Sequence, residues 1–235
     1  MKRKSIVFFT GAGISAESGL QTFRESKDGL WNNYKIEDVC TPQAWHKNPS
    51  LVLDFYNLRR EQCQAAKPNK AHELIAQLEQ FYNVVVVTQN VDDLHERAGS
   101  SKIIHLHGEL MKSRSTIDSK LIYKCTESIH LNDKCEKGSQ LRPHIVWFGE
   151  MLEDSKIDEA IRYVMECDIC VIIGTSLQVY PANEIPSYVT EKCQVILIDP
   201  NCVSQTLGVN NIQFVQQTAV NGMEGIYEEL INVLL

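Results

Sequence analysis

Polar side chains that could bind and deprotonate a ligand gather in two nearby segments, TQNVDDLHERAG and IIHLHGEL. Gln89, Asn90 and Asp92 directly follow a run of valines, and His107 comes shortly afterwards. If the valine run is a strand of an open parallel sheet, these groups lie at its carboxyl end, where ligands bind in such folds. We therefore expect the four side chains to converge on one crevice.

His107 is the expected general base of this crevice. An ordinary histidine pKa of about 6.5 suits proton transfer at neutral pH. Gly108 follows His107 and gives its backbone room in a loop. His105 is the less favoured choice, because it could equally face the core beside Leu106.

Two glycine-containing turns indicate where a nucleotide could bind. Gly11-Ala12-Gly13 follows one apolar run and Gly174-Thr175-Ser176 another, and glycines at such junctions let the backbone approach a pyrophosphate near a helix N-terminus. The acidic second strand of a standard dinucleotide fold is missing, which disfavours a dehydrogenase. We expect the ribose contact at Asp199 and Asn201. A merely tight strand–helix turn remains the alternative for either cluster alone.

The elements that must position these groups follow from hydrophobic patterning. The runs IVFF, VVVV, CVII and VILI are continuous rather than alternating, which is typical of parallel strands buried on both faces. PNKAHELIAQLEQFY and DSKIDEAIRYVMECD carry apolar residues at helical spacing, and GMEGIYEELINVLL closes the chain as a helix. The pattern predicts an α/β fold: a Rossmann-like parallel sheet with helices on both faces.

Two stretches fall outside this alternation and predict a small second domain. We expect one catalytic unit over residues 1–235. The boundaries are a large Rossmann-like domain of residues 1–30, 68–110 and 142–235, and a small domain of residues 31–67 and 111–141.

Composition limits the function classes. The 235 residues carry a formal net charge of -7, which argues against general affinity for nucleic acid. No apolar run approaches membrane-spanning length. Eight scattered cysteines are expected to be core residues in a reducing compartment. We therefore expect a cytoplasmic monomer that binds neither nucleic acid nor membrane.

Five motifs, in order, resemble the sirtuin family of NAD-dependent protein-lysine deacylases: GAGISAESGLQTFR, TQNVDD, LHGEL, RPHIVWFGE and GTSLQVYPA. The resemblance runs from near the N-terminus to the last helix. It implies the same two-part fold and an acylated lysine of a protein as substrate. It also implies that NAD is a co-substrate consumed in the reaction, giving nicotinamide and O-acyl-ADP-ribose.

The resemblance also implies roles for individual residues. His107 would be the base toward a ribose hydroxyl, and Asn90 would be catalytic with it. Phe23 and Arg24, with Ala12, would cover the cofactor and exclude water. Val146, Phe148 and Gly149 would receive the substrate main chain as an added strand. The implied cofactor-binding set is Gly11, Ala12, Gly13, Ser15, Glu17, Phe23, Arg24, Gln89, Asn90, Asp92, Gly174, Thr175, Ser176, Asp199, Asn201 and Ala219.

Single residues point to a subclass. Gln21-Thr22 stands where most deacetylases of the family have Pro-Asp, and DFYNLRRE supplies Tyr56 and Arg59. Both features resemble the class III branch, which removes succinyl and malonyl groups. Residues three apart share a helix face, so a phenol and a guanidinium could bind one carboxylate. The alternative is a solvated Arg59 and a core Tyr56. Acetyl-lysine should remain a substrate.

Zinc is not expected. Zinc-bearing relatives have two Cys-x-x-Cys pairs in the second insertion, whereas this chain has Ser115 with Asp118, and Cys135 with Gly138. A site rebuilt from Asp118, Cys125, Cys135 and His130 is the less favoured alternative. We expect the segment to be held instead by apolar packing. The expected members are Leu121, Ile122, Tyr123, Ile129 and Leu131.

Two other functions stay open at this point. An NAD-dependent ADP-ribosyltransferase or glycohydrolase would share the first bond cleavage, with nicotinamide release independent of acyl-lysine. A non-catalytic sensor of acyl-lysine or NAD would keep the glycines but need no base, and His107 argues against it.

Overall fold

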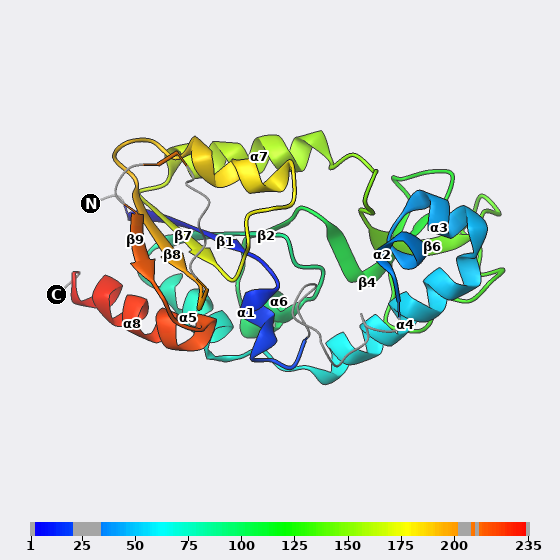
Figure 1. The fold of residues 1–235 in the computed structure, drawn as a ribbon, viewed down its shortest axis with the longest axis horizontal. Helices are drawn as coiled ribbons and strands as arrows, with labels where there is room; N and C mark the ends of the chain where they lie inside the picture. The colour runs from blue at the N-terminus through cyan, green and yellow to red at the C-terminus, as the bar shows by residue number, and fades with distance from the viewer. Residues whose placement is uncertain (1–2, 21–33, 202–207, 210–211, 234–235) are drawn as a thin grey trace.

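A computed structural model describes residues 3–20, 34–201, 208–209 and 212–233. Its central feature is a sheet of six parallel strands, in the order β3-β2-β1-β7-β8-β9 (Figure 1). The strands are β1 (Ser5–Thr10), β2 (Asn83–Thr88), β3 (Ile103–His105), β7 (Ile169–Ile173), β8 (Gln194–Ile198) and β9 (Ile212–Val215). Nearly every residue of β1, β2, β7 and β8 is buried, as continuous hydrophobic runs require. The predicted α/β fold is confirmed.

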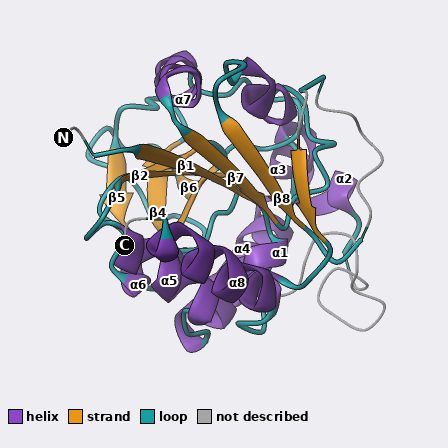
Figure 2. Cartoon of the chain, turned by 90° about the vertical axis from the view of Figure 1, so that its left-hand side faces the viewer, coloured by secondary structure: helices purple, strands orange, loops and turns teal. Residues whose placement is uncertain are grey.

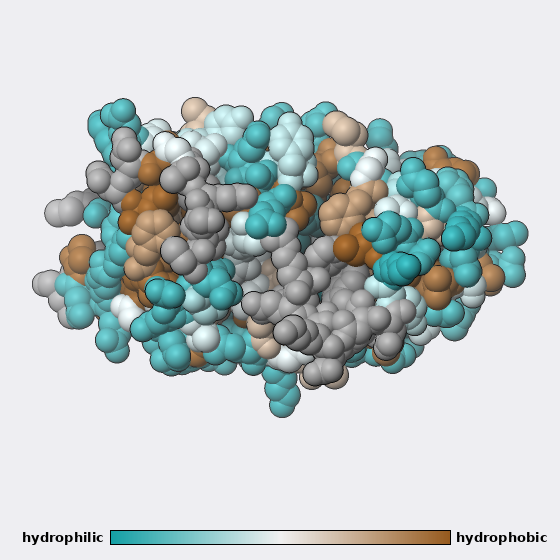
Figure 3. Space-filling view, in the orientation of Figure 1, coloured by the Kyte–Doolittle hydropathy of each residue, from teal (hydrophilic) through white to brown (hydrophobic). Residues whose placement is uncertain are grey.

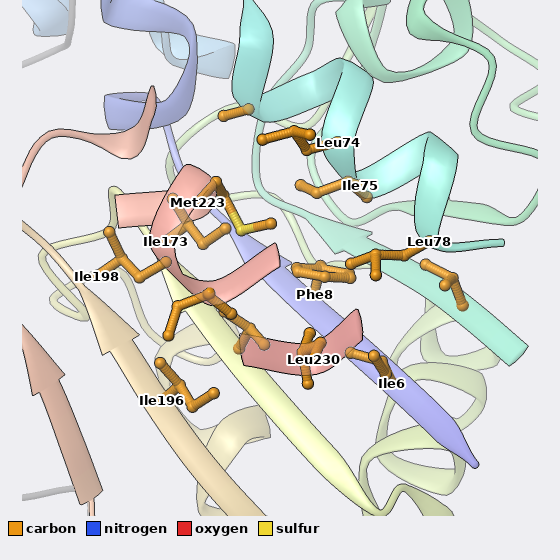
Figure 4. Packing of buried hydrophobic residues seen from close by; sticks show 14 of the residues in the cluster. Ile6, Phe8, Leu74, Ile75, Leu78, Ile173, Ile196, Ile198, Met223 and Leu230 are labelled. Carbon is orange, nitrogen blue, oxygen red and sulfur yellow. The ribbon is translucent and has the colours of Figure 1, made fainter. Parts of the chain in front are cut away.

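Helices cover both faces of this sheet (Figure 2). On one face lie α5 (Lys70–Leu78) and α8 (Ala219–Asn232), whose apolar residues meet those of β1, β7 and β8. Figure 4 shows Leu74, Ile75 and Leu78 of α5 beside Phe8 of β1. On the other face lie α7 (Asp154–Glu166) and the 3-10 helix η2 (Ala182–Tyr188). This two-sided burial supplies the core that holds the strand ends in place.

A second, smaller group of elements packs at the far end of the molecule (Figure 1). It contains α2 (Ile36–Val39), α3 (Pro42–Lys47), α4 (Pro49–Ala65) and an antiparallel sheet in the order β5-β4-β6. These strands are β4 (Gly108–Ser115), β5 (Ile122–Lys124) and β6 (Leu141–Ile145). A shared cluster around Phe55 and Trp147 joins them to the helices. The expected domain boundaries, after residues 110 and 141, pass through β4 and β6, so we keep the division as a proposal.

The expected apolar packing of residues 121–131 is wrong. Ile129 is buried, but Ile122 and Leu131 are 43% and 48% exposed. Hydrogen bonds hold the segment instead: Asn57 on α4 donates from Nδ2 to the Ile129 carbonyl (2.9 Å) and accepts from the Ile129 N–H at Oδ1 (2.9 Å). A short edge strand exposes its alternate side chains, so its apolar residues do not report a core.

Two local features also differ from expectation. The helix after the first glycine turn, α1 (Gly13–Ala16), has only four residues. The last helix begins at Ala219, three residues before the glycine where its pattern was expected to start, with Thr218 as its N-cap.

Within the described ranges, no helix combines the length and the apolar character needed to cross a bilayer. Figure 3 shows a largely hydrophilic surface on one face, with apolar residues gathered over β9.

Candidate active site

A cavity of about 760 Å³ opens between the carboxyl ends of the parallel strands and helix α4. Its size is that of an ordinary ligand site. It is lined from one side by the turns after β1, β2, β7 and β8, and from the other by α4 and the segment after β6. The two groups of elements therefore share one crevice, and residues far apart in sequence face each other across it.

The two glycine turns pack backbone against backbone at the floor of this cavity. Gly11 donates its N–H to the Ile173 carbonyl (3.0 Å), and Gly13 donates to the Gly174 carbonyl (2.8 Å). A Cβ on Gly13 would lie 2.6 Å from the Gly174 Cα, and one on Gly174, whose φ is +59°, would lie 2.5 Å from the Ile14 nitrogen. No side chain fits these contacts. The glycines thus serve the close approach of the two loops to each other, besides any approach to a ligand.

Helix α1 offers less to an anion than its sequence predicts. It spans only Gly13–Ala16, and the N–H groups of Gly13, Ile14 and Ser15 already donate to Gly174, Gly11 and Ala12. Ser15 instead contributes its side chain: Asn90 Nδ2 donates to Ser15 Oγ (3.2 Å), which donates to Asp92 Oδ2 (3.0 Å). This chain of polar contacts connects the glycine turn to the segment after β2.

Hydrogen bonds with other residues hold the side chains of Asp92 and Gln89 in place. Burial raises the pKa of Asp92, while its bonds from the Leu94 N–H and the Ser15 hydroxyl act in the opposite direction. Gln89 donates from Nε2 to Thr175 Oγ1 (2.9 Å), so the turn after β2 is tied to the turn after β7. These contacts fix the polar groups before any ligand arrives.

His107 has a defined tautomer. Its Nδ1 lies 3.0 Å from the Gln89 carbonyl oxygen, which can only accept a hydrogen bond. The proton of the neutral ring is therefore on Nδ1, and Nε2 keeps its lone pair. Burial lowers the pKa of His107, with the hydrogen bond to Gln89 opposing it, so the ring is a neutral base at pH 7.

Tyr56 and Arg59 lie on α4 and line the opposite wall. Tyr56 is buried and donates from its hydroxyl to Cys40 Sγ (3.4 Å), and burial raises its pKa well above the ordinary value. Arg59 is half-buried; burial lowers its pKa, while nearby Tyr56 and Cys40 act against this. Arginine stays charged at neutral pH. A phenol and a cation therefore share one face of the cavity, as the spacing predicts.

The segment after β6 is clamped by charged groups. Glu150 accepts from Arg142 at both carboxylate oxygens (2.6 and 2.9 Å), from Arg114 (3.1 Å) and from the Trp147 N–H (2.9 Å). Burial raises the pKa of Glu150, but the bonds from Arg142 and Trp147 outweigh it, so the net pKa is lowered. Val146 donates its N–H to the His107 carbonyl (2.9 Å). The segment is thereby fixed next to the base.

The far end of the cavity, lined by Asp199, Asn201 and Ala219, contains a contact that the sequence does not reveal. Glu17 accepts at its carboxylate from the Thr218 hydroxyl (3.2 Å) and from the Val220 N–H (2.9 Å). Its charge lies at the N-terminus of α8, where a carboxylate is favoured. Glu17 thus binds the last helix to the segment after the glycine turn.

All described residues of the predicted cofactor and substrate sets line this one cavity; Phe23 and Arg24 lie outside the described residues. Their roles stay predictions. Cavity residues outside those sets include Cys40, Phe55, Trp147, Leu152, Gln178, Tyr180 and Thr218. Gln178 and Tyr180 belong to the GTSLQVYPA motif, which was a usable signal. No sequence signal marks Cys40, because it reaches the cavity only through the packing of α2 and α4.

The residues at the expected zinc positions do not supply a tetrahedral set. Cys135 Sγ lies 3.4 Å from Ser115 Oγ, which lowers the pKa of Cys135 to about 7. Asp118 is paired with Lys137 (2.6 Å). One thiolate, with its neighbours engaged elsewhere, lacks the ligands of a structural zinc site. Another group with metal-ligand chemistry in the described part of the chain is Glu96, His105 and Glu109.

Known proteins match the chain over almost its full length. The Sir2 family profile matches residues 11–181. A relative named NAD-dependent protein deacylase from Helicobacter pylori (strain ATCC 700392 / 26695) is 48% identical over 230 residues, which are 98% of this chain and 99% of that protein. One of the same name from Bacteroides thetaiotaomicron is 48% identical over 234 residues, covering 97% and 98%.

Solved structures agree with these matches. A Sir2 homologue in complex with NAD superposes with a TM-score of 0.89 at 40% identity, covering 100% of this chain and 92% of its own. A Sir2 structure with a deacetylated p53 peptide and 3'-O-acetyl ADP-ribose superposes with a TM-score of 0.78 at 29% identity, covering 97% and 94%.

Proposed function

The chain belongs to the Sir2 family, the sirtuins, and from this premise we propose that it removes succinyl and malonyl groups from protein lysines in preference to acetyl groups. It is an NAD-dependent protein deacylase, and NAD is its co-substrate. When bound, NAD supplies the ADP-ribose that takes up the acyl group as nicotinamide leaves. The contribution of the protein is to orient the reactants, to exclude water and to move one proton.

The proton transfer falls to His107. Its Nε2 keeps a lone pair because Nδ1 is bound to the Gln89 carbonyl, and its lowered pKa keeps it unprotonated at pH 7. We assign it the proton of a ribose hydroxyl. Such a positioned base contributes about 10²–10⁴-fold to a rate.

Positioning of the nucleotide falls to the turns around the base. We propose that Asn90, Asp92 and Gln89 orient the nicotinamide ribose, since their side chains are buried or half-buried and held by Ser15 and Thr175. The turn of Gly174–Ser176 and the residues Asp199 and Asn201 line the same cavity, and we assign them the remaining nucleotide contacts. Holding the reactants in such an orientation is the main way in which the site would accelerate the reaction.

The observation that carries the acyl preference is the placement of Tyr56 and Arg59 in the cavity that also contains His107. A guanidinium binds a carboxylate through two parallel N–H bonds, and the Tyr56 phenol adds a third when its hydroxyl turns from Cys40 to the carboxylate. A succinyl or malonyl group ends in such a carboxylate, whereas an acetyl group does not. Acetyl-lysine remains a substrate because the smaller group fits the same space.

Substrate main chain is proposed to lie along Val146, Phe148 and Gly149. The clamp of Glu150 by Arg142 and Arg114 fixes this segment, and the peptide-bound relative supports an acylated protein as partner. We further propose a cytoplasmic monomer. The net charge of -7 supports weak affinity for nucleic acid.

One comparison tests the acyl preference. Peptides of one sequence carrying acetyl-, malonyl- or succinyl-lysine are incubated with NAD, and both nicotinamide and O-acyl-ADP-ribose are followed. We expect kcat/KM to be at least about tenfold higher for the charged acyl groups. Equal values, or a preference for acetyl, would remove the charged-acyl assignment. Nicotinamide release that does not depend on acyl-lysine would favour a glycohydrolase or ADP-ribosyltransferase instead, and acyl-lysine binding without nicotinamide release would favour a sensor.

A further inference from the structure

The side chain of His105 lies buried beside the proposed site but has no part in the mechanism above. It ends strand β3 and is 6% exposed. Its Nδ1 lies 3.0 Å from the Asn90 carbonyl oxygen, and its Nε2 lies 2.7 Å from Oε1 of Glu96. A carbonyl oxygen only accepts, and so does a carboxylate. Both contacts are satisfied together when each ring nitrogen carries a proton, which is the imidazolium form.

The surroundings of His105 suit a buried cation. The Glu96 side chain belongs to α6 (Leu94–Ala98) and is 40% exposed, so water reaches it. Glu109 of β4 places a carboxylate oxygen within 4.8 Å of the same ring. Burial taken alone lowers the pKa of His105, but the bond to Glu96 and the charges of Glu96 and Glu109 raise it above the ordinary value.

Other charged groups lie near His105. Lys156 of α7 donates to the main-chain oxygen of His105 (3.2 Å), and Lys112 of β4 lies 2.8 Å from Glu109. Asp92, in the turn after β2, attracts a charged His105, and a proton on His95 of α6 would repel it. Burial holds the pKa of His95 well below its ordinary value, so His95 is neutral. Three carboxyl side chains and two lysines thus lie near His105.

What His105 holds is the turn that carries the nucleotide-orienting residues. Residues 105–107 bind three consecutive carbonyl oxygens of residues 88–90. Leu106 takes the first through its N–H (3.0 Å), His107 the second through Nδ1 and His105 the third through Nδ1. His105 is therefore the charged member of the contact that fixes Asn90 relative to the base.

We propose that His105 is a positioning residue of the deacylase: as a charged imidazolium between Glu96 and the Asn90 carbonyl, it keeps Asn90 in register with His107, and loss of its proton at alkaline pH lowers turnover. After deprotonation one ring nitrogen presents a lone pair to an acceptor, and that contact is lost. The inference rests on the proposed function, because turnover is the property that it explains.

The same three groups, Glu96, His105 and Glu109, have the chemistry of a metal site. Two observations favour the imidazolium. Lys112 contacts both carboxylate oxygens of Glu109 at 2.8 Å, and a metal on Nε2 would have to displace the 2.7 Å contact with Glu96. The test below must therefore also be able to detect a bound zinc ion.

The protonation state is tested without any activity assay. Nitrogen-15 NMR of histidine-labelled protein, with and without EDTA, reports the protons on each ring nitrogen of His105, assigned by its loss in His105→Gln. We expect two protonated nitrogens at pH 7 and loss of one proton only at higher pH. A neutral ring at pH 7, or an Nε2–H that forms only after EDTA treatment, overturns the proposal; the latter result would mark a metal site.

The positioning role is tested by the pH profile of kcat. Glu96→Gln removes a charge at a partly exposed position but keeps an acceptor, so we expect the alkaline limb to move to lower pH by about one unit, with kcat at pH 6 changed less than about twofold. His105→Gln should remove that limb and lower kcat about tenfold. His130→Gln, an exposed histidine, is the matched control and should leave the profile unchanged.

These outcomes separate the two proposals. An unmoved alkaline limb in Glu96→Gln overturns the positioning role, even in an active deacylase. A chain that shows the imidazolium by NMR but releases no acyl group from any acyl-lysine overturns the proposed function and the positioning role that rests on it, and leaves only the protonation state established.

Discussion

Nδ1 of His107 lies 3.0 Å from the main-chain oxygen of Gln89, so the tautomer of the proposed base is set by the turn whose residues we propose to orient the nucleotide. The backbone, not another side chain, orients the ring. The partner at Nδ1 is a main-chain oxygen, which does not titrate, so the orientation of the ring depends on the integrity of one loop.

Replacing the base tests its role directly. We expect His107→Tyr to lower kcat/KM for acyl-lysine by at least about 10²-fold, because a phenol is protonated at neutral pH and cannot accept the ribose proton. The measurement is formation of O-acyl-ADP-ribose. His130→Tyr, on an exposed loop position, is the control and should keep normal turnover. Turnover of His107→Tyr near the wild-type rate would contradict the assignment.

Acid should destabilise the fold through buried neutral histidines. Burial lowers the pKa of His72 and of His144 to about 4, so both stay neutral in the folded chain at pH 6 to 5, while an unfolded histidine gains a proton below about pH 6.5. The unfolded state therefore binds more protons in this range. As the pH is lowered, the free energy of unfolding falls by up to about 1.4 kcal/mol per pH unit for each of the two histidines. Urea denaturation at constant ionic strength measures this. A free energy of unfolding that stays constant from pH 6 to 5 would contradict it.

The charged-acyl pocket predicts a selective defect in Arg59→Met. We expect KM for succinyl-lysine to rise about 10–100-fold, because a charge-assisted bond to the acyl carboxylate is lost, while KM for acetyl-lysine changes less than about threefold. Tyr56→Phe should show a smaller effect of the same kind. Arg162→Met, on the exposed face of α7, is the control. Equal effects of Arg59→Met on both substrates would argue for a structural role.

The packed glycine turns predict different costs for two alanine substitutions. Gly174 and Gly138 have similar positive φ angles, +59° and +75°, but a Cβ meets backbone at 2.5 Å on Gly174 and nothing within 4 Å on Gly138. Both variants pay about 1 kcal/mol of backbone strain. Gly174→Ala should cost roughly 1–3 kcal/mol more and weaken NAD binding, because the two loops must separate. Equal unfolding free energies of the two variants would contradict this packing argument.

Metal removal should leave the fold intact. We expect the purified protein to contain far less than one zinc per chain, and its Tm to be the same with and without EDTA, since Cys135 is hydrogen-bonded to Ser115 and Asp118 forms an ion pair with Lys137. Metal analysis and thermal unfolding measure both quantities. A drop in Tm on chelation, reversed by zinc, would show that Cys125, His130 or other groups bind a metal after all.

The core strands of the sheet and much of the cavity lining could be predicted from the sequence, and the reason is physical. Continuous burial of β1, β2, β7 and β8 leaves a strong signal, and polar residues at strand ends must converge on one edge. The short strands β3 and β9 leave weak signals: they have three and four residues, and β9 is only partly buried.

Contacts between distant segments escape sequence reasoning. Glu17 binds Thr218 and Val220, and nothing local marks it as a partner of the last helix. Residues 121–131 look like a small core, yet Asn57 holds them by hydrogen bonds from another element. The two side-chain contacts of His105, with Asn90 and Glu96, likewise depend on where β3 ends relative to the turn after β2.

The pairing of Gly13 with Gly174, and of Glu17 with the start of α8, has a consequence for synthesis on the ribosome. The first cofactor turn is made early, but its packing partners emerge about 160 and 200 residues later. At typical elongation rates this delay lasts on the order of ten seconds or more. A nascent chain can therefore join its first glycine turn to Asn90 early, but it lacks the contact with Gly174 until about 160 more residues have been made, and the proposed nucleotide crevice is among the last of these features to close.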